Sequence, residues 1–425
     1  MKNSLYSAIT LVLLTVAFSG CKDKTFERVT YEANVPVYMA FSDFRSSFAK
    51  SEPQDITVPG KIYFKDNYLF VNEYGKGIHV IDNADPANPK KIAFYKILGN
   101  IDMAIRGNTL FADSYIDLVS IDITDINNPV EKGRLKNVFP EIVPEGDKWY
   151  PYSNVDKTKG VIIDWEVKTI TEDREPGDYS WRFLKGDFVS FMAAAETNGN
   201  MNGSAGVAGS MARFMLNEQY LYLIALPWRL KTVDVTPSQL IVKDSVDVSR
   251  SMETLYRMGN KLFIGTTTGM LIYDITIPEK PVQVSAYNHF TACDPVVVDG
   301  NYAYVTLRTG TRCTNGSNLM EVIDISSITN PYLVKSYPMF NPHGLGVDGD
   351  LLFVCDGDAG LKVYDKSDPL QILNNQLAHY KDFNTFDVIP LNKILMLIGA
   401  NGIYQYDYSD PKNIKQISQL KIVAK

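Results

Sequence analysis

The chain has 425 residues and is acidic, with 49 Asp and Glu residues, 42 Lys and Arg residues and a formal net charge of −7. Nucleic acids are bound largely through excess positive charge, so this balance argues against a nucleic-acid partner. The sequence contains four histidines and no P-loop, dinucleotide glycine motif or Gly-x-Ser-x-Gly motif. It therefore offers no motif from which an enzyme activity could be inferred.

Residues 1–20 have the pattern of a signal peptide, with an apolar run from Ala8 to Phe18 that is too short to cross a membrane. The sequence Phe-Ser-Gly-Cys that ends at Cys21 is similar to a lipobox, in which the cysteine is cleaved and acylated. An ordinary secretory signal with an incidental cysteine is the alternative. Lipid on Cys21 would anchor the protein without a spanning helix. We therefore expect a membrane-anchored lipoprotein of the cell envelope, at the outer membrane or cell surface.

Residues 21–55 are expected to form a lipidated tether and then a segment that packs on the rest of the chain. Tyr38, Met39, Phe41 and Phe44 make this second part too apolar to remain in water. Such a segment can help to close a ring of sheets by covering a strand edge. The pattern does not identify which edge it covers.

From residue 56 onward, an apolar run that ends in an aspartate and a turn recurs, first as GIHVIDNADPANP at 77–89. We call this residue the pivot aspartate. The seven pivot aspartates are Asp82, Asp122, Asp234, Asp274, Asp324, Asp365 and Asp407. Most successive copies are about 40 residues apart, which is typical of a repeat protein. Because Asp in a turn accepts a hydrogen bond from its own backbone two residues on, we interpret the pivot aspartates as turn residues.

Each repeat contains four short apolar runs separated by Gly, Asn and Asp turns, without helical periodicity. Four strands in about 40 residues are typical of one β-propeller blade. We predict an all-β propeller of seven four-stranded blades over residues 56–425, with an insertion at about 139–212. The alternative is an eighth, degenerate blade within the insertion, because Asp164 lies 42 residues after Asp122. No Asn-Pro corner follows Asp164, which favours seven.

The phrase GIHVIDNADPANPKKIAFY at 77–95 resembles the LVIVD-repeat proteins, a family of predicted β-propellers on bacterial and archaeal cell surfaces. The resemblance extends from about Gly60 to the C-terminus, apart from the insertion. It implies a propeller fold and a location at the cell surface. The family carries no catalytic motif, so the resemblance implies no mechanism.

In a four-stranded meander, the loop between strands two and three lies on the same face as the link between blades. We call this the loop face, and we call the opposite face, which carries the pivot aspartates, the corner face. The insertion and the loops 307–318 and 355–360 should all lie on the loop face, where binding residues of rigid scaffolds are common.

One polar residue begins each innermost strand, and these strands line the axial channel of a propeller. The seven channel residues are Lys61, Asp102, Arg213, Glu253, Asp294, His343 and Asp387. We predict that they surround the mouth of the channel. They form either a mixed, mostly acidic pocket for a small polar or cationic ligand, or a rim that is simply solvated.

Three cysteines remain after Cys21, and all should lie on the loop face. A disulfide is expected in an exported chain, with Cys293–Cys313 the most economical pair and Cys313–Cys355 the alternative. We expect no cofactor. Zinc held by the three cysteines and His343, or calcium held by loop carboxylates, is the less favoured interpretation.

The sequence therefore predicts a monomeric, non-catalytic binding scaffold that takes a protein, a glycan or a small ligand on its loop face. The alternative is a hydrolase or lyase that uses His343 and a carboxylate of the channel residues as an acid–base pair.

Overall fold

The computed structural model describes residues 26–174, 207–208, 210, 212–236, 239–289, 295–308, 317–381 and 383–423. The chain forms two compact units. The first comprises Met1–Val37, Glu145–Asp156 and Asp164–Asp187, and the second comprises the remaining residues. Cys21, Cys293, Cys313 and Asp294 lie outside the described residues.

The first unit is built on a two-stranded ribbon in which β1 (Glu27–Met39) pairs with β11 (Val161–Arg174). The Asn34 amide donates hydrogen bonds to the backbone oxygens of Asp147 and Tyr150 at 2.8 and 2.9 Å, which fixes the adjoining loop. Asp164 belongs to β11. The ribbon has only these two strands among the described residues, so the predicted alternative of an eighth blade at Asp164 is wrong.

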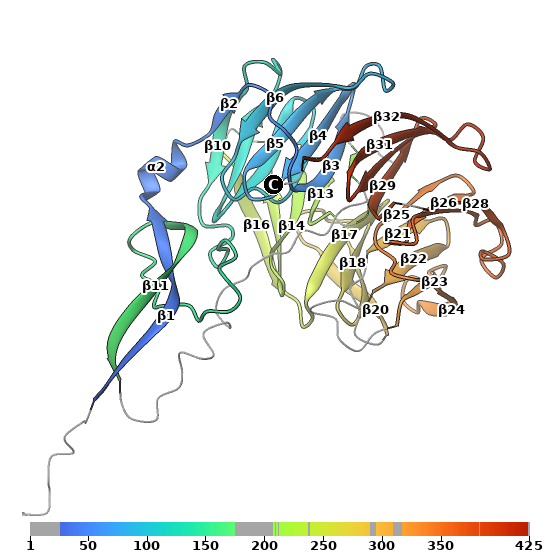
Figure 1. Cartoon of the computed structure of the whole chain (residues 1–425). Coiled ribbons are helices and arrows are strands. Elements are labelled where there is room, and N and C mark those ends of the chain that lie inside the picture. The colour runs from blue at the N-terminus through green and yellow to red at the C-terminus, as the bar shows by residue number, and fades with distance from the viewer. Residues whose placement is uncertain are drawn as a thin grey trace, which may run out of the picture. The chain divides into compact units, whose positions relative to one another are not determined.

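The second unit is a β-propeller, and its described residues form seven antiparallel blades of four consecutive strands each (Figure 1). Blade one contains β3 (Pro59–Lys65), β4 (Tyr68–Glu73), β5 (Gly77–Asp82) and β6 (Lys90–Lys96). Blade two contains β7 (Met103–Arg106), β8 (Thr109–Ser114), β9 (Asp117–Asp122) and β10 (Val130–Leu135). Blade three contains β13 (Phe214–Asn217), β14 (Tyr220–Leu226), β15 (Arg229–Asp234) and β16 (Ile241–Asp247). The prediction of seven blades is confirmed.

The remaining four blades follow without a long interruption. Blade four contains β17 (Met252–Met258), β18 (Lys261–Thr266), β19 (Gly269–Asp274) and β20 (Val282–Asn288). Blade five contains β21 (Val296–Asp299), β22 (Tyr302–Leu307), β23 (Leu319–Asp324) and β24 (Tyr332–Pro338). Blade six contains β25 (Leu345–Asp348), β26 (Leu351–Cys355), β27 (Leu361–Asp365) and β28 (Gln376–Tyr380). Blade seven contains β29 (Thr385–Leu391), β30 (Ile394–Gly399), β31 (Gly402–Asp407) and β32 (Lys415–Lys421).

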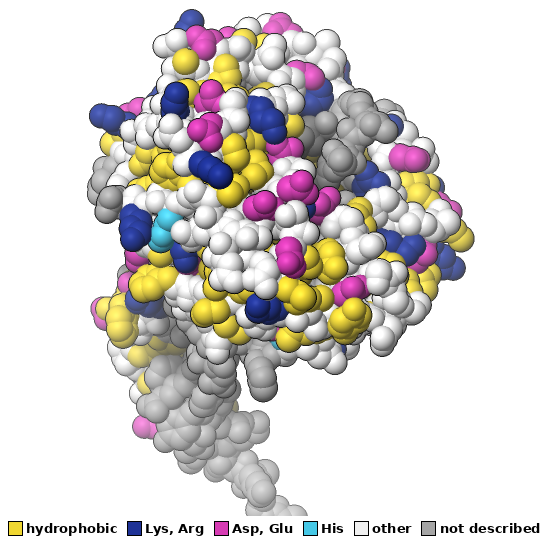
Figure 2. Space-filling view, turned by 90° about the vertical axis from the view of Figure 1, so that its right-hand side faces the viewer, with side chains coloured by type: hydrophobic (Ala, Val, Ile, Leu, Met, Phe, Trp, Pro, Cys, Tyr) yellow, Lys and Arg dark blue, Asp and Glu magenta, His cyan; other side chains and the backbone are white. Residues whose placement is uncertain are grey.

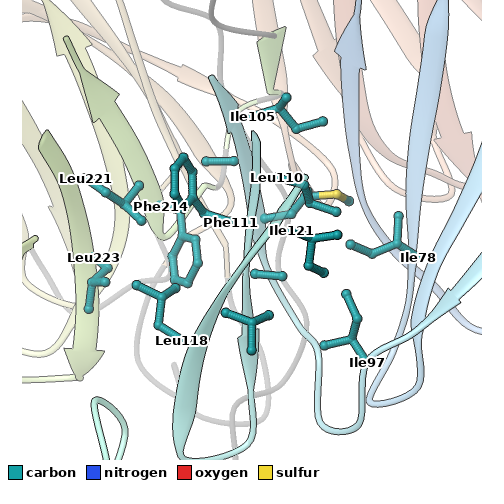
Figure 3. Packing of buried hydrophobic residues seen from close by; sticks show 14 of the residues in the cluster. Ile78, Ile97, Ile105, Leu110, Phe111, Leu118, Ile121, Phe214, Leu221 and Leu223 are labelled. Carbon is teal, nitrogen blue, oxygen red and sulfur yellow. The ribbon is translucent and has the colours of Figure 1, made fainter. Parts of the chain in front are cut away.

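The hydrophobic core lies between neighbouring blades, because each blade buries apolar side chains on both of its faces. Figure 3 shows blade two in this position, with Phe111 and Ile121 buried among side chains of blades one and three. Ile78 of blade one and Phe214 of blade three belong to this cluster. The outermost strands are more exposed, as the burial pattern of β16 illustrates.

The pivot aspartates act as turn residues in all seven blades, as predicted. In each case Oδ1 accepts a hydrogen bond from the backbone N–H two residues later, at 2.7 to 3.0 Å. These bonds satisfy the backbone at the corner between the third and fourth strands. The corner face is therefore built in the same way from blade to blade.

Hydrogen bonds also confirm the assignment of the two faces. On the loop face, the N–H of Gly75 in the β4–β5 loop donates to the oxygen of Asn100 in the link to blade two, at 2.9 Å. On the corner face, the N–H of Asn83 donates to the oxygen of Asn67 in the β3–β4 turn at 2.7 Å.

The segment after β1 packs on the propeller. In helix α2 (Phe41–Arg45), Phe44 is buried with its ring 6.3 Å from that of Tyr115. Arg45 Nε lies 2.9 Å from Asp117 Oδ2 of blade two. Strand β2 (Ala49–Ser51) then pairs with β6 and covers the outer edge of blade one. No helix among the described residues is long and apolar enough to span a membrane.

Blades seven and one close the ring, and Figure 1 shows these red and blue blades side by side. Each is complete in itself, so the described closure depends on side chains and on a parallel bridge between Ile56 and Ile422, in which the Val423 N–H donates to the oxygen of Ile56 at 2.8 Å. The buried amides of Asn83 and Gln405 exchange two hydrogen bonds, at 2.9 and 2.7 Å. Ser418 donates to the oxygen of Pro86 at 2.6 Å.

Replacing Gln405 by alanine is expected to destabilise the ring by about 1–3 kcal/mol, because the buried amide of Asn83 loses its partner. Urea denaturation of Gln405→Ala, Asn83→Ala and the double variant measures the coupling between the two amides. The double variant should lose less unfolding free energy than the two single variants together. The control is Gln416→Ala, which changes an exposed side chain. Strictly additive costs would contradict a coupled pair.

Candidate functional site in the central channel

Four of the predicted channel residues meet inside the ring. Lys61 Nζ of blade one donates a hydrogen bond to Asp102 Oδ2 of blade two at 2.6 Å. The same oxygen accepts the backbone N–H of Arg213 at 2.6 Å. Asp387 of blade seven is close enough to Lys61 for the ammonium to stabilise its charged form. Lys61 therefore lies between two carboxylates from its neighbouring blades.

These four residues are buried, so they do not form an open rim. The exposed fraction is 2% for Lys61 and for Asp102, 7% for Arg213 and 0% for Asp387. Burial lowers the pKa of Lys61 and of Arg213 and raises the pKa of Asp387 well above its usual range. Asp387 Oδ2 is buried and accepts no hydrogen bond from the described residues. Whether this group binds a ligand stays a prediction.

Asp113 extends the cluster and organises the link between blades one and two. Its Oδ1 accepts hydrogen bonds from Asn100 Nδ2 at 2.8 Å and from the backbone of Ile101 and Asp102 at 2.8 and 2.9 Å. Burial nevertheless raises the pKa of Asp113 to about 6, because desolvation outweighs these hydrogen bonds.

The end of the insertion covers the cluster. Strand β12 (Val207–Ala208) pairs with the channel edge of β3, and Ser210 Oγ lies 3.2 Å from Asp387 Oδ1 in blade seven. The oxygen of Ala212 accepts the N–H of Leu255 in blade four at 2.7 Å. We call the described residues between 207 and 213 the crossing segment, because they contact several blades before blade three begins.

Gly344 makes room for this contact. A Cβ at this position would lie 2.1 Å from Asp387 Oδ1 and 2.7 Å from Ser210 Oγ, so a larger residue would separate them. Sequence reasoning missed the crossing segment, since its partners lie far away in the chain and no local pattern marks them. The small residues of the segment are the only local sign of close packing.

A second group surrounds His343 in blades four to six. The attraction between Glu253 and Arg308 counters the effect of burial on the Arg308 guanidinium, whose pKa is lowered. Burial, and then repulsion from Arg308, lower the pKa of His343 to about 3. His343 Nε2 lies 3.3 Å from Asn341 Nδ2, and no described carboxylate is hydrogen-bonded to its ring. A neutral imidazole with this pKa is a weak proton acceptor at neutral pH.

The remaining sequence predictions concern cysteines and metals. Cys355 is buried and carries a free thiol whose pKa is raised by burial. Lipid on Cys21 and a Cys293–Cys313 disulfide fall outside the described residues and stay predictions. No group of three or more His, Cys, Asp or Glu residues in the described part of the chain could hold a metal ion.

Two exposed aromatic side chains, one of them in contact with His343, were also missed by sequence reasoning. Phe340 is 60% exposed and Phe386 is 37% exposed, with the Phe386 ring 5.4 Å from that of His343. Asn384 donates a hydrogen bond to the exposed Asp358 next to them. We call Phe340, His343, Asp358, Asn384 and Phe386 the aromatic surface. Figure 2 shows one side of the molecule, where apolar, acidic and basic side chains are interspersed.

Comparison with known proteins identifies one repeat. Residues 291–338, which contain blade five, match the LVIVD repeat. No curated protein matches the chain.

Three solved structures are similar at low sequence identity. The computationally designed Ika8 protein is 10% identical, with a TM-score of 0.49 and coverage of 87% of this chain and 92% of that one. BamB from Moraxella catarrhalis is 8% identical, with a TM-score of 0.47 and coverage of 90% and 97%. A protein from Lactobacillus plantarum is 10% identical, with a TM-score of 0.48 and coverage of 86% and 97%. At this level of similarity the matches carry no functional conclusion.

Replacing Lys61 by methionine is expected to destabilise the propeller by about 3–5 kcal/mol, because it leaves the buried Asp102 carboxylate without its ammonium partner. The control is Lys132→Met, whose pair with Asp122 spans 3.6 Å with side chains 57% and 36% exposed. This exposed pair should contribute less than about 1 kcal/mol. Thermal and urea unfolding measure both, and equal small effects would mean that the channel is open to water.

The raised pKa of Asp113 predicts a pH-dependent contribution to stability. The folded state holds this proton more tightly than the unfolded state, whose pKa is near 3.8, so the contribution is complete below about pH 4. It is lost as the pH rises through about 6. Between pH 4 and 7 the wild type should therefore lose about 2 kcal/mol relative to Asp113→Asn, which does not titrate. Urea denaturation across this range tests the difference, and a constant offset would refute it.

Proposed function

We propose that this LVIVD-repeat β-propeller is a non-catalytic binding scaffold of the cell envelope, which holds a protein or glycan partner on its loop face. The exposure of Phe340 and Phe386 on the aromatic surface carries the proposal. Aromatic side chains of this kind gain little for folding when they remain in water, and they are common anchors in binding sites.

The backbone beneath Phe340 is held firmly, although its ring is exposed. The buried Asp356 carboxylate accepts the N–H groups of Phe340 and Asn341 at 3.0 and 2.9 Å. Lys362 Nζ lies 2.5 Å from Asp356 Oδ2 and balances the charge of this carboxylate. Because this loop is already ordered, binding a partner there costs less entropy. This supports the interpretation that the exposed Phe340 ring belongs to a binding site.

The chemistry of the aromatic surface limits the class of partner. Its rings offer apolar faces, while Asp358 and Asn384 offer a carboxylate and an amide at the edge. This combination suits stacking against a sugar ring or an apolar side chain, together with hydrogen bonds to hydroxyl or amide groups. The buried channel residues leave the outer loop face as the accessible place for such a partner.

Replacing both Phe340 and Phe386 by alanine should weaken partner binding by at least about tenfold while the protein remains folded, because neither ring is buried in the core. The partner is captured from envelope extracts with the intact protein and screened in parallel on a glycan array. The matched control is Ile277→Ala with Leu370→Ala, which removes exposed apolar side chains from the corner face. Equal binding by both double variants would place the partner elsewhere.

Membrane attachment is tested separately. The wild type should fractionate with membranes and incorporate labelled palmitate, whereas Cys21→Ser should do neither, because it lacks the thiol that carries the lipid. Protease treatment of whole cells then distinguishes a surface location from an internal one. A Cys21→Ser variant that stays in the membrane fraction would argue against a lipid anchor at this residue.

A further inference from the structure

The crossing segment occupies the channel in the manner of a bound peptide. We propose that the channel is a second binding site, for an extended peptide that pairs with β3 and presents a serine to Asp387, and that the crossing segment is an internal substitute for that peptide. This site is separate from the aromatic surface and does not depend on it.

The first support is the inner edge of β3, which accepts an additional strand. Val207 pairs with Phe64 and Ala208 pairs with Tyr63, so β12 is an additional strand on the inner side of blade one. Among the described residues, no other blade carries an additional strand on this side. Addition of a strand to a sheet edge is a general mode of peptide binding, because backbone hydrogen bonds supply the affinity.

A free peptide can compete with β12 for the inner edge of β3. Among the described residues the pairing of β12 involves two residues of β3, whose full length is the seven residues Pro59–Lys65. A peptide that pairs along the whole of β3 can therefore form more backbone hydrogen bonds with this edge than the described part of the crossing segment does. This difference gives a free peptide a means of displacing the segment.

The second support is a small recess that fits a serine side chain. Ser210 is fully buried, and its hydroxyl donates to Asp387 Oδ1 at 3.2 Å and accepts the N–H of Leu345 at 2.8 Å. The recess thus offers one acceptor and one donor at the same point. Gly344 lines it, and its missing side chain fixes the size of the group that enters. An apolar side chain of similar volume would leave both partners unsatisfied.

The third support is the free-energy cost of burying charged residues in the channel. Lys61, Asp102 and Asp387 are buried beside the crossing segment, and Asp387 Oδ2 has no described hydrogen-bond partner. Dehydration of charged and polar groups opposes burial unless their partners compensate it. Opening the segment returns water to these groups, which lowers the free-energy difference between the covered and uncovered channel.

Displacement of the crossing segment need not extend beyond Ser210. The oxygen of Ala212 is bonded to Leu255, and the N–H of Arg213 is bonded to Asp102. These two bonds hold the start of blade three. Movement of Val207, Ala208 and Ser210 can therefore uncover the edge of β3 and the serine recess while all seven blades remain folded.

Native-state hydrogen exchange on the wild-type protein tests the opening. The Leu345 amide, which is bonded to Ser210 Oγ, should exchange at least about a hundredfold faster than the Phe353 amide in β26 of the same blade. Exchange of both amides at the rate of global unfolding would overturn the proposal. This measurement needs no variant, so it decides the question even if a variant fails to fold.

A labelled peptide tests binding directly. The probe is AGVAGSM, the sequence of residues 205–211, and its affinity is measured by fluorescence anisotropy. Ser210→Asp in the full chain places a carboxylate beside Asp387 and should open the channel, so it should bind the probe at least about tenfold more tightly than the wild type. The control, Ser327→Asp on the corner face, should bind like the wild type.

A second peptide tests the serine recess. A probe with valine in place of its serine should bind the Ser210→Asp protein at least about tenfold more weakly. Equal binding of the two probes, or no gain on Ser210→Asp, would overturn the proposal. The variant that lacks the rings of Phe340 and Phe386 should bind the serine probe unchanged, so failure here is distinguishable from failure of the loop-face partner site.

Discussion

A four-stranded sheet with two apolar faces cannot bury both of them by itself, and this constraint determines the propeller. Each blade places its apolar side chains against the next blade, as Phe111 and Ile121 do between blades one and three. The last blade must then meet the first, or two apolar faces remain in water. The amide pair of Asn83 and Gln405 lies at this last interface, where it gives a mainly apolar contact a defined register.

Most of the fold could be predicted from the sequence because its repeating elements are local. The pivot aspartate bonds to a backbone group two residues away, so its role is determined within one turn. The alternation of strands and turns within each repeat likewise determines which loops share a face. The LVIVD resemblance led to the same fold, and blade five carries the repeat.

The candidate site could be predicted only in part, because its contacts are distant in sequence. The register of the innermost strands correctly brought Lys61 and Asp102 together. No local pattern could show that Ser210 would meet Asp387, which is 177 positions away. The channel residues were therefore expected at an open mouth, whereas four of them are buried, namely Lys61, Asp102, Arg213 and Asp387. Phe340 and Phe386 were missed because periodicity does not distinguish an exposed aromatic residue from a buried one, either in a link, as for Phe340, or at the start of a strand, as for Phe386.

The buried channel also changes where function can be sought. In an open channel the charged residues would meet ligands directly, but here Lys61 and Asp387 are shielded by residues of the same chain. The outer loop face can engage a partner without rearrangement. In the proposed second site, the channel becomes available when β12 and Ser210 move, so the two surfaces differ in the conformational free energy that binding requires.

The complete blades at the point of closure have a consequence for how the gene can be rearranged. Blades one and seven are each built from four consecutive strands, so neither blade needs a strand from the other end of the chain. Joining the end of β32 to the segment before β3 and cutting the chain at another blade link would preserve the four consecutive strands of each blade. Circular permutation, and the gain or loss of whole repeats by unequal recombination, are therefore open to this architecture in a way that a propeller with an interlaced final blade does not permit.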